Sequence, residues 1–449
     1  MSPIGSRLEA FASSPANEMR AQSLFRQAVF VMILLAVWIS TRPFYVADEG
    51  GAPPAGDIVN QLTFSSLAVA AFLGLCLTDR RAMMPMLQPS YLLLFVWLVF
   101  SVFQSTYFGV SFRAFAFTMI VIFLATALFA LPERFRQFQN LFLFATLGTM
   151  LMAYFGVIAL PHLGKHTDFD PFEPEHAGSW KGHYDHKNIA GGAMATFAIA
   201  GLYALRVERR KLGWVLLAGG VVFLYFTKSK TALALLPAAM LLGYMAERVR
   251  SLPLRLVICV GPVLALLALT LGGVLVPEIA DFNKAALKDP TFTGRFDIWR
   301  YGFEMLAAKP WTGYGYEAFW QTDTTLKGES RLELAWAVEK IIHGHNGYLD
   351  VALTLGIPGF MMVLYVFVLK PVLDYHQCQA GEDSRKLAGM FLMMWLFIAL
   401  DMCLETYFFR RADPVWFSLL VAVIGLRFSA VYRVAQSPSP DGQAYATSA

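Results

Sequence analysis

Charged residues are scarce in this sequence. Only 15% of its 449 residues are Asp, Glu, Lys or Arg, whereas 57% are hydrophobic. Ordinary soluble domains carry about 25% charged residues, so this balance excludes a globular domain surrounded by water. Stretches of about 20 apolar residues, the length that spans a bilayer as a helix, recur along the whole chain. They predict an all-α, polytopic membrane protein.

Cysteine and net charge are also low. The sequence has four cysteines, and all of them fall in apolar segments or in connections expected on the cytoplasmic side. No disulfide framework and no cysteine metal site is therefore indicated. The formal net charge of +4 is too small to indicate nucleic-acid binding. No internal repeat is present either.

Twelve apolar segments predict membrane-spanning helices, because a helix bonds its own backbone in lipid. They are residues 28–46, 60–77, 89–105, 112–131, 138–160, 188–206, 213–227, 230–247, 254–276, 346–370, 387–408 and 412–428. Lys and Arg cluster on every second connection, and basic loops stay on the cytoplasmic side. We therefore expect both termini in the cytoplasm and the long polar loop outside.

The domain organisation follows from these segments. Residues 1–27 are polar and lack a signal-peptide cleavage pattern, so we interpret them as a retained cytoplasmic tail. The other expected parts are a membrane scaffold, a main membrane domain with a large helical outer loop, and a disordered tail. The scaffold spans residues 28–160, and the main membrane domain spans 161–433 with its outer loop at 277–345. The disordered tail covers 434–449.

The outer loop at 161–187 holds five of the eight histidines, beside several acidic residues. His183, Asp185 and His186 offer imidazole and carboxylate groups, which are ligands of metal ions. Their spacing matches no strong zinc pattern, and a solvated acidic loop explains them as well. We expect no metal and no cofactor.

Two polar groups follow at the start of the next predicted helix. Lys187 and Asn188 are suitable to bind a phosphate or a sugar. Alternatively, Lys187 anchors the helix at the membrane interface and Asn188 caps it. Both interpretations remain open.

A very short turn, Thr227 to Thr231, carries Lys228 and Lys230 on the outer side, against the expected charge bias. The next helix begins here, and its free N–H groups and dipole favour an anion such as a lipid diphosphate. We favour such an anion site over lysines that merely reach toward lipid headgroups.

The long outer loop predicts two helices lying over the membrane. The first follows Gly294, with Phe296, Trp299, Phe303 and Leu306 on one face, and ends before Pro310 and Gly313. The second begins with the capping-box pattern Ser330 to Glu333 and reaches about Ile342. The tryptophans and tyrosines suit stacking on sugars, but anchoring at the bilayer interface is the safer interpretation.

His345 stands directly before the next apolar segment, near the outer surface. Imidazole titrates near neutrality and can take a proton from a hydroxyl nucleophile, with Asp350 as a candidate orienting partner. A lone histidine is more often structural, and His343 is interpreted as a loop residue. Asn346 follows as a candidate substrate-binding residue.

Asp401 and Glu405 lie at the outer end of the eleventh segment, and Arg410 and Arg411 precede the twelfth. Carboxylates within a membrane are costly to bury unpaired, so they mark functional candidates. Pairing with Arg410, Lys228 or Lys230 would make them structural, and this ranks first for Asp401. Anion binding stays open for Arg410 and Arg411.

Five short segments resemble, in their order along residues 180–370, the O-antigen ligase and polysaccharide polymerase superfamily of bacterial inner-membrane glycosyltransferases. They are Gly182 to Asn188, Ser229-Lys230-Thr231, Gly294-Arg295 with Ile298-Trp299, Pro310-x-x-Gly313-x-Gly315, and His345-Asn346-Gly347-Tyr348-Leu349.

The resemblance implies a fold of about twelve spans with a large periplasmic loop, and metal-independent transfer of a glycan from undecaprenyl diphosphate to an acceptor hydroxyl. It implies that Arg295 holds the diphosphate and that His345 is the base. Lys230 stands where the family has an arginine, and lysine lacks the bidentate guanidinium. In-line attack at the anomeric carbon predicts inversion.

We therefore expect a polymerase of lipid-linked oligosaccharide repeat units at the periplasmic face of the inner membrane, among membrane lipids and without nucleic acid. Trp180 and Gly182 before the His-Lys-Asn segment favour the exopolysaccharide polymerases. The alternative is a ligase that transfers polysaccharide to lipid A core, since both share donor and motifs. A transporter or flippase would predict internal repeats and broken helices.

Overall fold

The computed structural model describes residues 15–44, 57–78, 80–168, 174–287, 289–327, 338, 341–378 and 381–432. In these ranges the chain forms helices and turns, and its only β-pairing is an isolated bridge between Lys165 and Trp180. The predicted all-α class is confirmed. The predicted tail over 434–449 and the first part of the predicted tail over 1–27 lie outside the described residues.

Every one of the twelve predicted segments overlaps a helix of the bundle. These helices are α2 (Pro15–Trp38), α3 (Ile58–Cys76), α4 (Pro89–Phe103), α5 (Phe108–Ala127), α6 (Phe135–Ala159), α8 (Lys187–Arg206), α9 (Arg210–Thr227), α10 (Lys230–Arg248), α11 (Leu252–Leu267), α16 (Gly347–Leu364), α18 (Glu382–Asp401) and α19 (Pro414–Val431). The short α17 (Lys370–His376) continues α16.

Nine helices of the described part are long and apolar enough to cross a membrane. The predicted polytopic membrane class is thereby confirmed. Helix α4 is apolar but shorter, while α10 and α18 carry charged residues at their ends, which lowers their mean hydropathy.

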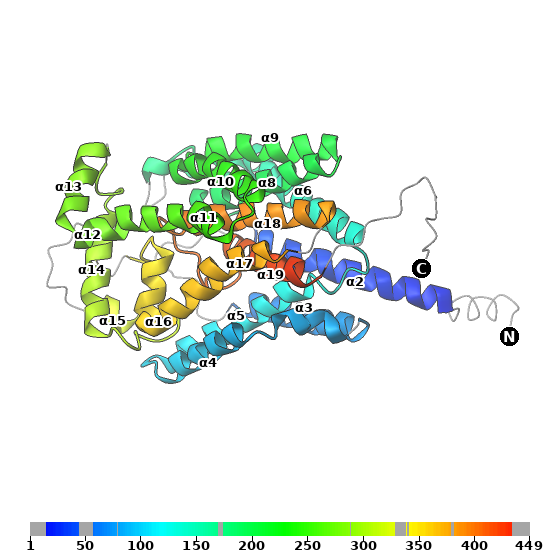
Figure 1. Cartoon of the computed structure of the whole chain (residues 1–449), viewed down its shortest axis with the longest axis horizontal. Helices are drawn as coiled ribbons and strands as arrows, with labels where there is room; N and C mark the ends of the chain where they lie inside the picture. The colour runs from blue at the N-terminus through cyan, green and yellow to red at the C-terminus, as the bar shows by residue number, and fades with distance from the viewer. Residues whose placement is uncertain are drawn as a thin grey trace, which may run out of the picture.

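Helix α2 differs from the prediction at both ends. It begins at Pro15, inside the predicted tail, and ends at Trp38, before the predicted end of the span. Hydropathy marks only the apolar half of this helix, whereas its polar half extends beyond the bundle (Figure 1). Arg26 ties that half to the bundle, because its Nε donates to the Leu131 carbonyl at 2.7 Å.

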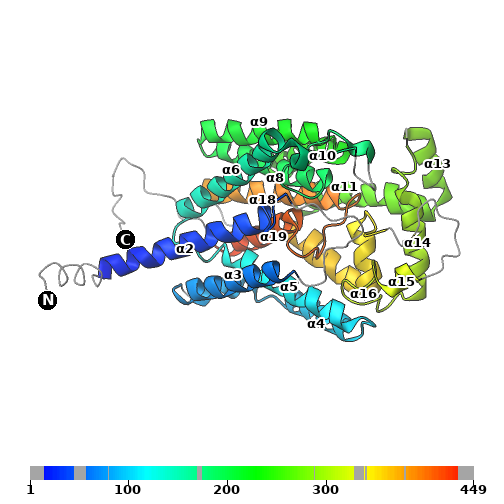
Figure 2. The same ribbon diagram turned by 180° about the vertical axis from the view of Figure 1, so that it is seen from behind.

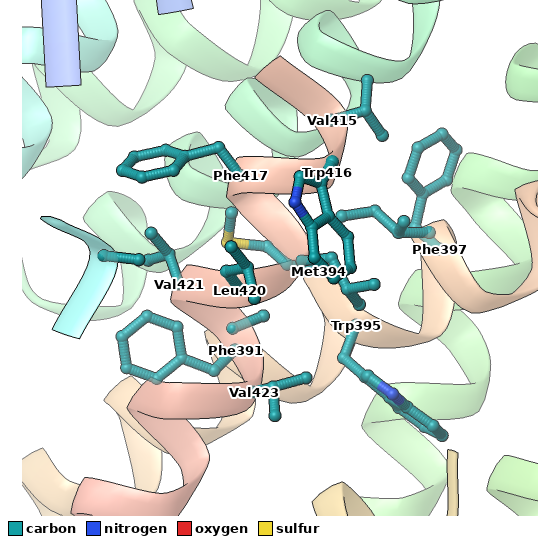
Figure 3. Close-up of a cluster of buried hydrophobic side chains, with 14 of the residues drawn as sticks. Phe391, Met394, Trp395, Phe397, Val415, Trp416, Phe417, Leu420, Val421 and Val423 are labelled. Atoms are coloured by element: carbon teal, nitrogen blue, oxygen red, sulfur yellow. The ribbon is translucent and has the colours of Figure 1, made fainter. Parts of the chain in front are cut away.

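The core lies between α18 and α19, which run through the middle of the bundle. A helix that is apolar on all sides is a buried one, and the middle turns of both helices fit that description. Figure 3 shows apolar side chains of both helices gathered in one cluster. Those drawn from the two helices include Phe391, Trp395, Phe397, Trp416 and Phe417, all fully buried.

Four helices form an outer assembly at the end of the bundle opposite the polar half of α2 (Figures 1 and 2). They are α12 (Gly273–Leu275), α13 (Pro277–Ala286), α14 (Arg295–Ala308) and α15 (Asp323–Leu326). The predicted helix after Gly294 is α14, and this prediction is confirmed. The predicted second helix, from Ser330, lies mostly outside the described residues.

Aromatic residues hold the outer assembly together. Trp299, Tyr301 and Tyr314 are buried in a second hydrophobic core with Phe319, Leu349 and Leu353. The expectation that these aromatics anchor the bilayer interface is therefore wrong for Trp299, Tyr301 and Tyr314. They are internal to the protein, whereas Trp311 remains 69% exposed.

Helix α16 breaks at Gly356, where φ is 68°. The apolar pattern predicts an unbroken helix here, and that expectation is wrong. Backbone groups freed within lipid need partners, and residues 310–315 of the outer loop supply them. The N–H groups of Tyr314 and Gly315 donate to the carbonyls of Leu353 and Thr354 at 2.9 and 3.1 Å. The break thus fixes the outer loop to the bundle.

Candidate functional site

Glu405 connects three residues that the sequence singles out. It lies in the turn that follows α18. Its Oε1 accepts from Arg295 Nη2 at 2.7 Å and from Asn188 Nδ2 at 2.8 Å, and its Oε2 lies 3.3 Å from His345 Nδ1. Arg295 begins α14, Asn188 lies in the first turn of α8, and His345 precedes α16. Four separate parts of the chain therefore meet at one carboxylate.

The electrostatics of Glu405 favour its ionised form. Burial alone would raise the pKa of this carboxyl, but Arg295 and His345 hold it well below its usual range. An ionised carboxylate only accepts hydrogen bonds, so Nδ1 of His345 carries the proton in this pair. The lone pair of Nε2 is then left as the basic atom.

His345 is held in an uncommon backbone conformation. Its φ is 49°, and its N–H donates to His343 Nδ1 at 3.3 Å. Burial lowers the pKa of His343 well below its usual range, and the charges of His345 and Arg410 act in the same direction. His343 is therefore a neutral acceptor that fixes the turn. The His345 side chain keeps 27% of its surface exposed, against 9% for Glu405.

Asp350 holds the same turn, but it does not orient His345. Its carboxylate accepts from the Gly344 N–H at 3.0 Å, from Thr406 Oγ1 at 2.7 Å and from Trp320 Nε1 at 2.8 Å. The expectation that Asp350 partners His345 is wrong. Glu405 takes that place, and Asp350 fixes the residue before His345.

Asn346 is fully buried and caps α16. Its Oδ1 accepts from the N–H groups of Tyr348 and Leu349, and its Nδ2 donates to the Cys403 carbonyl at 2.8 Å. All of its side-chain polar atoms are thus used within the protein. In this structure Asn346 shapes the turn beneath His345 and presents no surface to a ligand.

The arginines near the site differ in their exposure and in the contacts that they make. Arg295 is 16% exposed; besides Glu405 it contacts the Leu404 carbonyl through Nη1. Arg410 is half-buried and donates to the Thr406 carbonyl at 3.3 Å, whereas Arg411 is exposed. The alternative in which Glu405 pairs with Arg410, Lys228 or Lys230 is wrong, since Arg295 is its cation.

Asp401 has no arginine or lysine partner among the described residues, and so its expected ion pair is absent. Its carboxylate accepts a hydrogen bond from the Tyr407 hydroxyl at 3.2 Å. Asp401 is 1% exposed and ends α18. It supports the turn that carries Glu405.

Histidines, and not Asn188, cap the start of α8. His166 Nε2 accepts from the Lys187 N–H at 3.1 Å, and His186 Nδ1 accepts from the Asn188 N–H at 3.2 Å. These two backbone donors are therefore not open to a phosphate. The rings of His166, His176 and His186 lie 5.1–5.8 Å apart, but no group of residues in the described ranges is arranged to hold a metal ion.

Lys228 and Lys230 lie on the predicted short turn between α9 and α10. Lys228 adopts a left-handed conformation with φ of 55°, and its Nζ donates to the Ala177 carbonyl at 3.4 Å. Lys230 is exposed at the first position of α10. In the described part of the chain, neither lysine contacts Glu405 or His345. The two lysines therefore form a positively charged turn that is separate from the Glu405 cluster.

Two comparisons with known proteins bear on this geometry. Residues 214–364 match the family model described as O-Antigen ligase. This range contains Lys228, Lys230, Arg295 and His345. Over these residues, about a third of the chain, the protein is similar to the O-antigen ligase family. The expected resemblance is therefore confirmed for residues 214–364.

The chain is also similar to a curated relative. It is 31% identical over 86 residues to the exopolysaccharide production protein ExoQ of Rhizobium meliloti (strain 1021). The similar region covers 18% of this chain and 19% of that protein, so the chain matches about a fifth of the relative's length.

Asn188 and Glu405 lie outside the range that matches the family model. The sequence marks Glu405 as a carboxylate at the outer end of an apolar segment, which is a signal for function. Its partner was not predictable, because Arg295 lies 110 residues away in the chain. The fold brings the two together.

Proposed function

We propose that the protein polymerises lipid-diphosphate-linked oligosaccharide repeat units, with His345 as the base. The His345–Glu405 contact carries this proposal, because a partly exposed imidazole held by a buried carboxylate is suited to accept a hydroxyl proton. Nε2 of His345 would deprotonate the acceptor hydroxyl, and the resulting oxygen would attack the anomeric carbon of the donor glycan with inversion.

The leaving diphosphate needs positive charge more than it needs a proton, since stabilising developing charge is the largest catalytic contribution in such sites. Arg410 and Arg411 lie in the turn that follows Glu405, and Lys187 begins α8 beside Asn188. Lys228 and Lys230 extend this charge along the outer edge. We infer that these side chains bind undecaprenyl diphosphate, while Arg295 chiefly holds Glu405.

The setting of the reaction is part of the proposal. The alternation of basic connections supports cytoplasmic termini and a periplasmic site in a bacterial inner membrane. The acceptor would be a sugar hydroxyl on a second lipid-linked glycan. The name of the relative, an exopolysaccharide production protein, supports the polymerase.

A ligase is the second candidate, and the family description O-Antigen ligase favours it. Such an enzyme would use the same donor and base but would transfer finished polysaccharide to lipid A core. The two functions differ in the acceptor, so the acceptor decides between them.

The test uses the purified full-length protein in liposomes, with lipid-linked repeat unit as the sole substrate. A ladder of longer lipid-linked glycans supports the polymerase. Transfer that begins only after lipid A core is added, and that occurs once per core, supports the ligase. No transfer to either acceptor by folded protein would contradict both.

A further inference from the structure

Glu317 lies beside the site on a segment that the structure anchors firmly. The preceding residue, Tyr316, is 1% exposed; its hydroxyl donates to Thr118 Oγ1 at 2.7 Å. Its ring packs against Phe409, with 5.5 Å between the ring centroids. These contacts place Glu317 next to the turn that carries Arg410 and Arg411.

The backbone at Glu317 has a φ of 50°. Residues with a Cβ rarely adopt this left-handed conformation, which is about 1–2 kcal/mol less favourable for them. The same segment uses glycine at two such positions, Gly313 and Gly315. Glycine would relieve the strain at residue 317 as well, and strained side chains of this kind concentrate at functional sites.

The Glu317 carboxylate has no hydrogen-bond or ion-pair partner in the described part of the chain, although its side chain is half-buried. Burial and the nearby Asp350 raise its pKa to about 7, while Arg410 and Arg411 act against this rise. Asp350 itself is fully engaged by Trp320, Gly344 and Thr406. Of the two carboxylates, Glu317 is the one left to accept hydrogen bonds.

Arg410 and Asp350 connect Glu317 to the catalytic turn. Arg410 acts electrostatically on both Glu317 and His343. Asp350 accepts a hydrogen bond from Trp320, three residues after Glu317, and another from the N–H of Gly344, the residue before His345. Glu317 thus lies near the turn that carries His345.

We propose that Glu317 is the acceptor-positioning residue: its carboxylate accepts hydrogen bonds from hydroxyls of the acceptor sugar and holds that sugar beside His345. The inference rests on the proposed function. A carboxylate that accepts two sugar hydroxyls distinguishes a glycan acceptor from water, and charge-assisted hydrogen bonds of this kind are about twice as strong as neutral ones.

The test compares Glu317→Gln and Glu317→Gly with wild type in the liposome assay, with acceptor and donor varied separately. Both variants should raise the KM for the acceptor by roughly tenfold or more and leave the KM for the donor unchanged. Glu317→Gly should melt at or above the wild-type temperature, because it removes the strain. Asp323→Asn, which alters an exposed ion pair with Lys327 in the same loop, should behave as wild type.

Three results would overturn the inference: an unchanged acceptor KM in both Glu317 variants, an effect on the donor KM instead, or a loss confined to kcat. Failure of the proposed function itself looks different, because the wild-type protein would then transfer no glycan under any condition.

Discussion

His345 and Glu405 lie 60 residues apart in the chain, yet Nδ1 of His345 meets Oε2 of Glu405 at 3.3 Å. The other carboxylate oxygen is occupied by Arg295 and Asn188. Rotation of the Glu405 carboxylate would therefore break at least one of these contacts. A base fixed in this way has one tautomer and one direction for its free nitrogen.

Replacing Glu405 by Gln should lower kcat by about 100-fold, because an amide no longer enforces the proton on Nδ1 of His345. The KM for the donor should change little. The measurement is steady-state transfer at saturating donor and acceptor. Glu405→Asp, which keeps the charge, should recover part of the rate, and equal activity of Glu405→Gln and wild type would contradict the assigned partner.

Arg295 offers a test of its own role. If it chiefly holds Glu405, Arg295→Gln and Glu405→Gln should be non-additive, with a coupling energy of about 1–3 kcal/mol in a double-mutant cycle of kcat. If Arg295 instead clamps the diphosphate independently, the two effects should add, and Arg295→Gln alone should raise the donor KM. The cycle separates the two roles.

The pH dependence of acceptor binding should follow Glu317. Burial raises its pKa to about 7, so the charged form that accepts sugar hydroxyls is present above about pH 7 and is lost as the pH falls below it. The acceptor KM of the wild type should therefore rise on acidification. The KM of Glu317→Gln should be high at all pH values, and a parallel rise in that variant would assign the titration to another group.

Gly313 should be intolerant of any side chain. Its φ is 64°, and an added Cβ would lie 2.6 Å from Leu353 O and from Gly356 N. Gly313→Ala should destabilise the protein by about 2–4 kcal/mol, seen as a lower melting temperature and lower membrane abundance. Gly261→Ala is the matched control, since nothing lies within 4 Å of its added Cβ. Equal stability of the two variants would contradict the described contact between the outer loop and the break in α16.

The membrane helices could be predicted from the sequence because each one needs a continuous run of apolar residues. Each apolar segment corresponds to a helix, and Gly294, Pro310 and Gly313 mark the limits of α14 by their local chemistry. Helix α2 shows the limit of this approach, because its polar half has no hydropathy signal and is helical nonetheless.

The site could be predicted only in part from the sequence. Arg295, Asn188 and His345 could be singled out one at a time from local pattern, and the structure brings them together. Their common partner, Glu405, depends on a contact between α14 and the turn after α18, which no local pattern encodes. The same holds for Asn346 and Asp350, whose polarity indicates function although their hydrogen bonds are structural.

The most direct test of the account is the rate of glycosidic bond formation by His345→Ala at saturating donor and acceptor, with His162→Ala as an exposed histidine control. Loss of a general base should lower kcat by about 100-fold to 10,000-fold, at wild-type membrane abundance, while His162→Ala keeps the wild-type rate. An His345→Ala protein that is folded and transfers glycan at the wild-type rate would contradict the assignment of His345 as the base.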